Sequence, residues 1–213
     1  MANKKLNRME KIYFWCYLMK TITHRIFPTV LTEFSYDISS EEESTVHREL
    51  NDRFKYNPDV FPINTIDYLH IHIPQFARFI IDTSNTILTD TFKYSYDSIE
   101  ITNMWASKYE KGQTHAPHTH ANNVLSGVYY LTNGTPLQFF DPRPNVLSPT
   151  CIENTIDNVS AFDFNAVKGT GVIFPSWMQH WVPTTSDTRI SISWNIILRG
   201  HYGGHLNLQN AKI

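Results

Sequence analysis

In several short segments in the second half of the chain, two different sets of side chains alternate from one residue to the next. This alternation constrains the fold more than any other feature. The segments are 99–109, 124–131, 136–141, 171–175 and 189–198. A period of two residues is that of a β-strand. In the first segment the residues that share one face are Ile99, Ile101, Asn103, Trp105, Ser107 and Tyr109. Glycine, proline, asparagine and aspartate residues separate the segments, which predicts an antiparallel β domain of jelly-roll type.

Two amphipathic helices are predicted before this β domain. Residues 39–56 contain Ser40 and Glu43 at capping-box spacing, and their apolar residues recur every fourth position at Val46, Leu50 and Phe54. A second helix is expected over 74–94, where Pro74 suits the first turn. Its common face carries Phe76, Phe79, Ile80, Thr83, Ile87 and Thr91. We expect both helices to buttress one sheet, with their charged faces in solvent.

The length fits one domain behind an irregular leader. A chain of 213 residues has room for one domain of ordinary size. The apolar run at 12–19 is far shorter than the roughly 20 residues that cross a membrane, and no cleavage site follows it. We therefore expect no signal peptide and no membrane association. The expected organisation is a leader at 1–18 and a single domain at 19–213, made of a helical buttress at 19–96, a β core at 97–199 and a tail at 200–213.

Charge and cysteine content argue against several functions. The net charge is −2, so bulk charge does not favour binding to nucleic acid or to an anionic membrane. The two cysteines, Cys16 and Cys151, are too few for a disulfide framework. A reducing compartment, the cytoplasm, therefore fits the composition best.

Histidines supply the first candidate site. The chain has ten, and three of them lie in the sequence HAPHTH at 115–120. Residues i and i+2 of a strand share a face, so His118 and His120 can present two imidazoles to one point. His70 and His72 have the same spacing, but nothing around them completes a site, and we interpret that pair as structural.

A third histidine and an arginine extend the site. His180 lies between two predicted strand segments, where it can approach the first pair from a facing sheet. Three imidazoles suit iron, zinc, copper or nickel and leave positions open for other ligands. Arg189 follows nine residues later and shares a strand face with Ser191 and Ser193. An arginine can bind a carboxylate bidentately, with Ser191 as a further donor, although a surface ion pair is the simpler interpretation of Arg189 alone.

These residues resemble the iron(II)- and 2-oxoglutarate-dependent dioxygenases, in particular their prolyl-4-hydroxylase-like branch and a set of short oxygenases found in phages and bacteria. The family pattern Tyr-x-x-Gly, five residues, His-x-Asp matches Tyr109, Gly112 and His118, with His120 in the carboxylate position. Four further pieces follow in the family's order: LSGVYYL, LQFFDPR, GTGVIFPSWMQH and RISISW. The resemblance covers about residues 99–198.

The resemblance implies a fold, an activity and a set of ligands. The fold is a mostly β, double-stranded β-helix with buttressing helices. Iron(II) is held by His118 and His180, and 2-oxoglutarate chelates the iron with its far carboxylate on Arg189 and Tyr130. The activity couples oxidative decarboxylation of 2-oxoglutarate by dioxygen to hydroxylation of a substrate. The substrate is unidentified, and a prolyl or other protein or peptide side chain is preferred over a small molecule.

His120 departs from the family pattern, in which the third ligand is a carboxylate. Three neutral imidazoles leave one more unit of positive charge on the iron, which tightens binding of a dianionic cosubstrate and disfavours oxidation of Fe(II). We take His120 as the third ligand. The alternatives are Asp141 as the carboxylate, or a water ligand with His120 only hydrogen-bonded.

Two other functions remain open at this point. A cupin-type metalloenzyme also has a glycine, five residues and His-x-His, as at Gly112 to His120, but its glutamate is missing here and it has no need of Arg189. A non-catalytic β module with a structural metal is the second. Trp105 and Tyr109 can line a substrate cleft, although alternating aromatic residues on a strand are more often part of the core.

Overall fold

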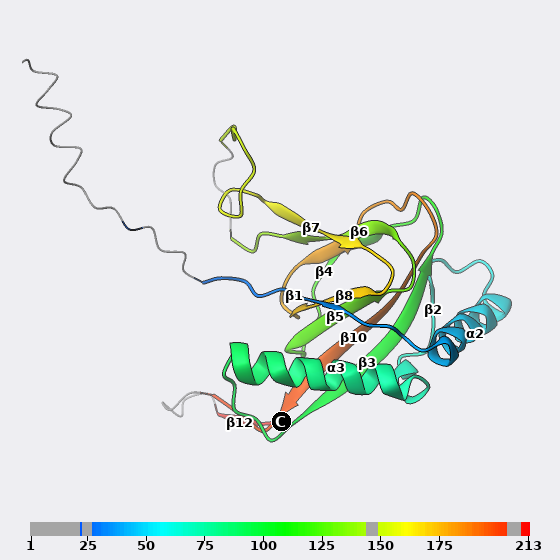
Figure 1. The fold of residues 1–213 in the computed structure, drawn as a ribbon, viewed down its shortest axis with the longest axis horizontal. Helices are drawn as coiled ribbons and strands as arrows, with labels where there is room; N and C mark the ends of the chain where they lie inside the picture. Colours follow the sequence, from blue (N-terminus) through cyan, green and yellow to red (C-terminus); the bar gives the residue numbers. More distant parts are fainter. Residues whose placement is uncertain (1–21, 23–26, 144–148, 204–209) are drawn as a thin grey trace, which may run out of the picture.

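Two antiparallel sheets form the centre of the molecule (Figure 1). The computed structural model describes residues 22, 27–143, 149–203 and 210–213, so the leader expected at 1–18 lies outside the described residues. The larger sheet has the strand order β1-β8-β5-β10-β3-β2. Its strands are β1 Thr32–Ser35, β2 Ile63–Asn64, β3 Ser98–Tyr109, β5 Leu125–Tyr130, β8 Thr170–Pro175 and β10 Arg189–Arg199.

The smaller sheet has the order β4-β9-β6-β7. Its strands are β4 His115–His118, β6 Gly134–Phe140, β7 Ala161–Ala166 and β9 His180–Val182. All five predicted strand segments are strands, whereas β1, β2, β4, β7 and β9 were not among them. The subdivision at residues 96 and 199 stays a prediction, and β1 and β2 lie within the part that we expected to be helical. The expected tail contains a small hairpin of β11 His201–Tyr202 and β12 Ala211–Lys212.

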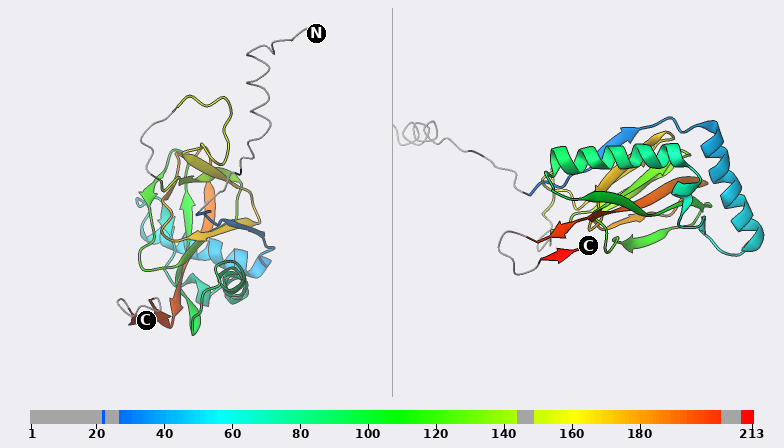
Figure 2. Two further views of the ribbon diagram at one scale, coloured as in Figure 1. Left: turned by 90° about the vertical axis from the view of Figure 1, so that its left-hand side faces the viewer. Right: turned by 90° about the horizontal axis from the view of Figure 1, so that it is seen from below.

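Helices cover the outer face of the larger sheet (Figure 2). They are α2 Ser40–Tyr56, η1 Leu69–Ile71, α3 Pro74–Thr86 and η2 Ile87–Thr91, the last a π-helical turn. A cluster of buried side chains from these helices and from the outer face of the sheet includes Phe76, Ile80, Leu88, Met104, Ile192 and Trp194. A second apolar cluster lies between the two sheets, with Val128, Tyr130, Leu137, Phe139, Phe164 and Val172 among its members. The expected buttressing of one sheet by helices is confirmed.

The start of α2 differs by one residue from the predicted capping box. Ser39 is the N-cap, and its hydroxyl accepts a hydrogen bond from the backbone N–H of Glu42 (3.2 Å). The Glu42 carboxylate is buried and accepts the backbone N–H groups of Gln75 and Phe76 at the start of α3 (2.8 and 3.3 Å). The buried face of α2 also ends earlier than predicted, since Phe54 is 46% exposed.

A β-bulge in β3 corrects the predicted alternation over 99–109. The register with β10 pairs Asn103 with Asn195 but Ile101 with Ile196, which leaves Thr102 unpaired. An extra residue reverses the faces beyond it. Ile101 and its neighbour Ile99 therefore pack into the helix-side core, whereas Trp105, Ser107 and Tyr109 face the space between the sheets.

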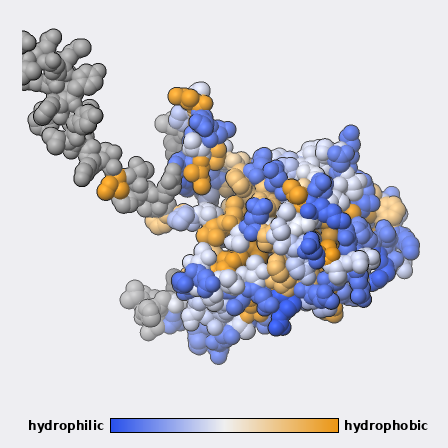
Figure 3. All heavy atoms as spheres, in the orientation of Figure 1, coloured by the Kyte–Doolittle hydropathy of each residue, from blue (hydrophilic) through white to orange (hydrophobic). Residues whose placement is uncertain are grey.

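The surface is mainly hydrophilic on the side shown in Figure 3. Apolar residues are visible on the body and on the projecting connection between β6 and β7, where Ile152 and Ile156 are exposed. Among the described residues, the helices are too short or too polar to cross a membrane.

Candidate metal centre

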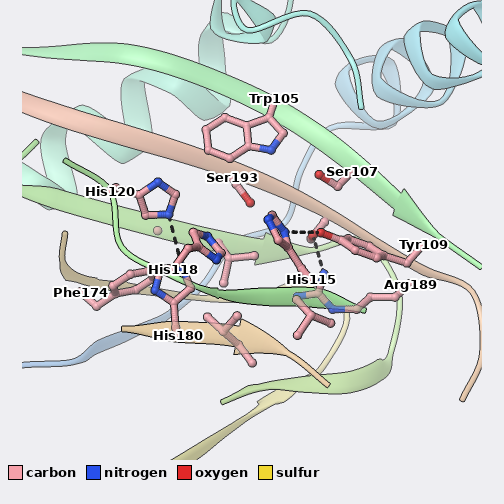
Figure 4. Close-up of a pocket in the computed structure, with 15 residues that line it drawn as sticks. Trp105, Ser107, Tyr109, His115, His118, His120, Phe174, His180, Arg189 and Ser193 are labelled. Atoms are coloured by element: carbon pink, nitrogen blue, oxygen red, sulfur yellow. Dashed lines mark hydrogen bonds between the residues drawn. The ribbon is translucent and has the colours of Figure 1, made fainter. Parts of the chain in front are cut away.

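The three predicted histidines meet at one end of the space between the sheets (Figure 4). One ligand nitrogen from each of His118, His120 and His180 lies within 4.8 Å of the other two. His118, the last residue of β4, pairs directly with His180, the first residue of β9. Strand β4 ends before His120, so the expected placement of His118 and His120 on one strand face is wrong. The turn after β4 nevertheless brings the His120 Nε2 atom to 3.2 Å from the His180 Nε2 atom.

Backbone carbonyls orient two of these rings. The Nδ1 atom of His118 lies 2.8 Å from the Ala116 oxygen, and that of His180 lies 2.8 Å from the Met178 oxygen. A carbonyl can only accept, so Nδ1–H donates in both cases and Nε2 keeps its lone pair. Such bonds fix the tautomer and the orientation of metal-binding imidazoles.

A buried network of hydrogen bonds supports the backbone at His120. The Ser126 hydroxyl lies 2.8 Å from the Ser176 hydroxyl and 2.6 Å from the Asn195 side-chain oxygen, and Asn195 in turn contacts the Asn103 amide at 2.8 Å. The Ser176 carbonyl accepts the backbone N–H of His120 (2.9 Å). Sequence reasoning missed this network, although Asn195 continues the strand face of Arg189, Ser191 and Ser193.

His120 and His180 are neutral at physiological pH. Burial, together with the smaller effect of the neighbouring imidazoles, lowers the pKa of His180 to about 3 and that of His120 to about 4. Neutral imidazole is the form that binds a metal ion. The three rings are the only His, Cys, Asp or Glu side chains among the described residues that converge in this way. The alternative ligand Asp141 instead pairs with Arg143 (2.8 Å).

Arg189 is buried, being 2% exposed, so its interpretation as a surface ion pair is wrong. It donates to the Ser191 hydroxyl (3.0 Å) and the Thr135 carbonyl (3.2 Å), and its guanidinium lies 5.1 Å from the centre of the Tyr130 ring. No acidic side chain in the described part of the chain pairs with it. The buried Tyr130 hydroxyl has no hydrogen-bond partner among the described residues. Burial raises the pKa of Tyr130 and keeps it protonated, against the opposing charge of Arg189.

A buried cation and an unsatisfied hydroxyl fit an anionic group, since an isolated buried charge is costly. Tyr109 lies beside them, with Arg189 5.4 Å from the centre of its ring. The hydroxyl of Tyr109 is 3.0 Å from the Nδ1 atom of His115, whose ring stacks on His118 at 4.3 Å. The strand period assigns no role to His115. The signal that could have found it is its place three residues before His118, in the same sequence HAPHTH.

The other histidine pair lies elsewhere. His70 belongs to the one-turn helix η1, so it does not share a strand face with His72. The Nδ1 atom of His72 lies 3.7 Å from a carboxylate oxygen of Glu49. Neither residue joins the cluster described above, and their structural role stays a prediction.

Comparisons with known proteins agree with this arrangement. Residues 103–195 match a family model described as "Putative 2OG-Fe(II) oxygenase". Among solved structures, a prolyl-4-hydroxylase from Pseudomonas putida is 16% identical with a TM-score of 0.55, over 81% of this chain and 89% of that chain. HygX from Streptomyces hygroscopicus, with nickel and 2-oxoglutarate bound, is 13% identical with a TM-score of 0.54, over 91% and 87%. The viral collagen prolyl hydroxylase from Paramecium Bursaria Chlorella virus-1 is 13% identical with a TM-score of 0.52, over 78% and 94%.

No curated protein matches the sequence. At these identities the solved structures show the fold, and they confirm the expected double-stranded β-helix with buttressing helices. Residues 103–195, less than half of the chain, are similar to the 2-oxoglutarate- and Fe(II)-dependent oxygenases, and the fold is that of their prolyl-hydroxylase-like members.

Proposed function

We propose that the protein is a non-haem iron dioxygenase that couples oxidative decarboxylation of 2-oxoglutarate to hydroxylation of a substrate. The observation that carries the proposal is the close approach of three imidazoles within 4.8 Å, in a pocket that also contains a buried arginine with no acidic partner among the described residues. A cupin-type site has no need of that arginine.

His118, His120 and His180 hold the iron in this proposal. The Nδ1–H bonds of His118 and His180 to backbone carbonyls hold their Nε2 atoms toward the cluster. With iron bound, the site supplies the oxygen chemistry that oxidises the cosubstrate and the substrate. Three neutral ligands leave the full charge of the ion in place, which favours a dianionic cosubstrate.

Arg189, Tyr130 and Ser191 bind the far carboxylate of 2-oxoglutarate. The arginine supplies the charge, and the Tyr130 hydroxyl has an unused proton to donate. The Ser191 oxygen accepts from Arg189, so its own proton is also free for the carboxylate. Apolar side chains exclude water from this end of the pocket, among them Val128, Leu137 and Val182.

The proposed substrate is a protein or peptide side chain, because two of the proteins with a similar fold are named as prolyl hydroxylases. A cytoplasmic location is proposed from the cysteine content alone. Dioxygen is the remaining reactant.

Calorimetry tests the metal site and the cosubstrate site separately. Mn(II) should bind the metal-free wild type and the His120→Asp variant, and it should not bind His118→Ala or His180→Ala; His47→Ala, on the surface of α2, is the control. In Mn(II)-loaded protein, Arg189→Ala should weaken 2-oxoglutarate binding by about 2 to 5 kcal/mol, the range for breaking a buried charge pair. Equal affinity of the wild type and Arg189→Ala for 2-oxoglutarate would reject the cosubstrate site and favour a cupin-type function.

A further inference from the structure

We propose that Trp105 and Ser193 form the substrate-binding wall of the pocket and that the group they hold beside the histidines is uncharged. The inference rests on the proposed function and concerns the part of the same pocket that the cosubstrate does not fill. We call Trp105 and Ser193 the substrate wall.

The substrate wall lies beyond the reach of a cosubstrate anchored at Arg189. In the pairing of β3 with β10, Arg189 lies opposite Tyr109, and four residues later Ser193 lies opposite Trp105. Four strand residues span about 13 Å, whereas the four C–C bonds of 2-oxoglutarate span at most about 6 Å. The Trp105 ring is 6.1 Å from that of His120. Figure 4 shows Trp105 and Ser193 beside His120, with Arg189 on the far side of His118.

No ionised side chain is available at the substrate wall. Among the described residues that line the pocket, Arg189 is the only Asp, Glu, Lys or Arg, and the cosubstrate carboxylate accounts for its charge. Beside the wall lie Ser107 and His120, the second of which is a proposed metal ligand. A charged substrate group would lose its hydration there and gain no partner. The electrostatics of the wall therefore select against charged groups.

The wall does offer neutral contacts. The Ser193 hydroxyl and the Trp105 indole N–H have no hydrogen-bond partner among the described residues, whereas the Ser107 hydroxyl is already used by Asn64 (2.6 Å). The half-buried indole presents an apolar ring to the pocket, and an indole packs against C–H groups while its N–H binds an acceptor. An uncharged group with a C–H face and an amide carbonyl meets both requirements. Blocked amino acids have this chemistry.

The test uses six N-acetyl amino acid N-methylamides, in which only the side chain varies. Proline, leucine and asparagine derivatives are the uncharged probes, and lysine, arginine and glutamate derivatives are the charged ones. Succinate formation by the Fe(II)-loaded protein with 2-oxoglutarate is measured with and without each probe, and the ratio is the readout. At least one uncharged probe should raise succinate formation about threefold or more, and the charged probes should not.

Variants assign the effect to the wall. Trp105→Ala should bring the ratio for the active probe to about one, and Trp105→Phe, which keeps a ring, should retain about half of the stimulation. Trp177→Ala is the matched control, because Trp177 is exposed and does not line the pocket. Stimulation by a charged probe, by none of the six, or equally in Trp105→Ala would overturn the inference. If the Fe(II)-loaded wild type forms no succinate from 2-oxoglutarate under any of these conditions, the proposed function is refuted, and the inference with it.

Discussion

Acidification is predicted to destabilise the metal-free protein through the buried histidine cluster. Burial lowers the pKa of His180 to about 3 and that of His120 to about 4, whereas a histidine in an unfolded chain has a pKa of about 6.5. The folded-state pKa lies below the unfolded one. The stability linked to these residues is therefore fully present above about pH 6.5 and is lost as the pH falls toward the folded-state values.

The size of the effect follows from the number of protons bound. At pH 5 the unfolded chain holds nearly one proton on each histidine, and the folded protein holds almost none. A difference of one proton changes the free energy of unfolding by about 1.4 kcal/mol per pH unit, so His180, which is 4% exposed, contributes a loss of about 2 kcal/mol between pH 6.5 and pH 5. His120 contributes less, because its ring is only partly buried and water screens its charge.

Urea unfolding in the presence of EDTA measures this loss at pH 7 and pH 5. Between pH 7 and pH 5 the free energy of unfolding of the wild type should fall by about 2 to 4 kcal/mol more than that of a His120→Asn/His180→Asn double variant. The double variant keeps all the carboxylates that titrate over the same range, so the difference reports the two histidines. His47→Asn should behave as the wild type. Equal losses in the wild type and the double variant would refute the reasoning, because the pH dependence would then come from other groups.

Two further substitutions test the supports of the fold and of the site. Glu42→Ala should lower the free energy of unfolding by about 2 to 3 kcal/mol, because the buried N–H of Phe76 and the partly buried N–H of Gln75 lose their acceptor. The control in urea unfolding is Glu41→Ala, since Glu41 is exposed, and equal effects of the two substitutions would contradict the argument. Asn195→Leu should weaken Mn(II) binding by about tenfold or more, because the network behind His120 is broken; calorimetry giving wild-type affinity in the folded variant would show that the network does not position the ligand.

Much of the site followed from the strand period. Arg189 and Ser191 share a face in any strand that contains them, and His180 was placed by the predicted strand segments on either side of it. The alternation along a strand does not predict which of its two faces packs against the second sheet. The position of that sheet decides whether Arg189 is buried or on the surface. Burial is thus a property of the pairing between distant strands, which no local pattern contains.

The misses have similar causes. Strand β1 carries one inward aromatic residue, Phe34, among polar neighbours, and β7 is an edge strand with Phe162 exposed. Neither has the apolar run of a central strand. Nothing in the sequence around Thr102 marks the extra residue of the bulge. The alternation of side chains continues through it, although the residues on its two sides point to opposite faces of the sheet. His120 meets the other histidines through a turn, which strand periodicity does not describe.

The two faces of β10 explain why the fold and the site cannot vary independently. One face places Ile192, Trp194 and Ile196 in the helix-side core, and the other carries the arginine, the serines and Asn195 of the site. A shift of one residue in pairing would exchange the two faces and bury the polar set under the helices. Gly127, opposite Trp194 on β5, has no room for a Cβ atom because the indole covers it. The close fit of Trp194 on Gly127 therefore holds the register, and the register in turn sets which side chains face the histidine cluster.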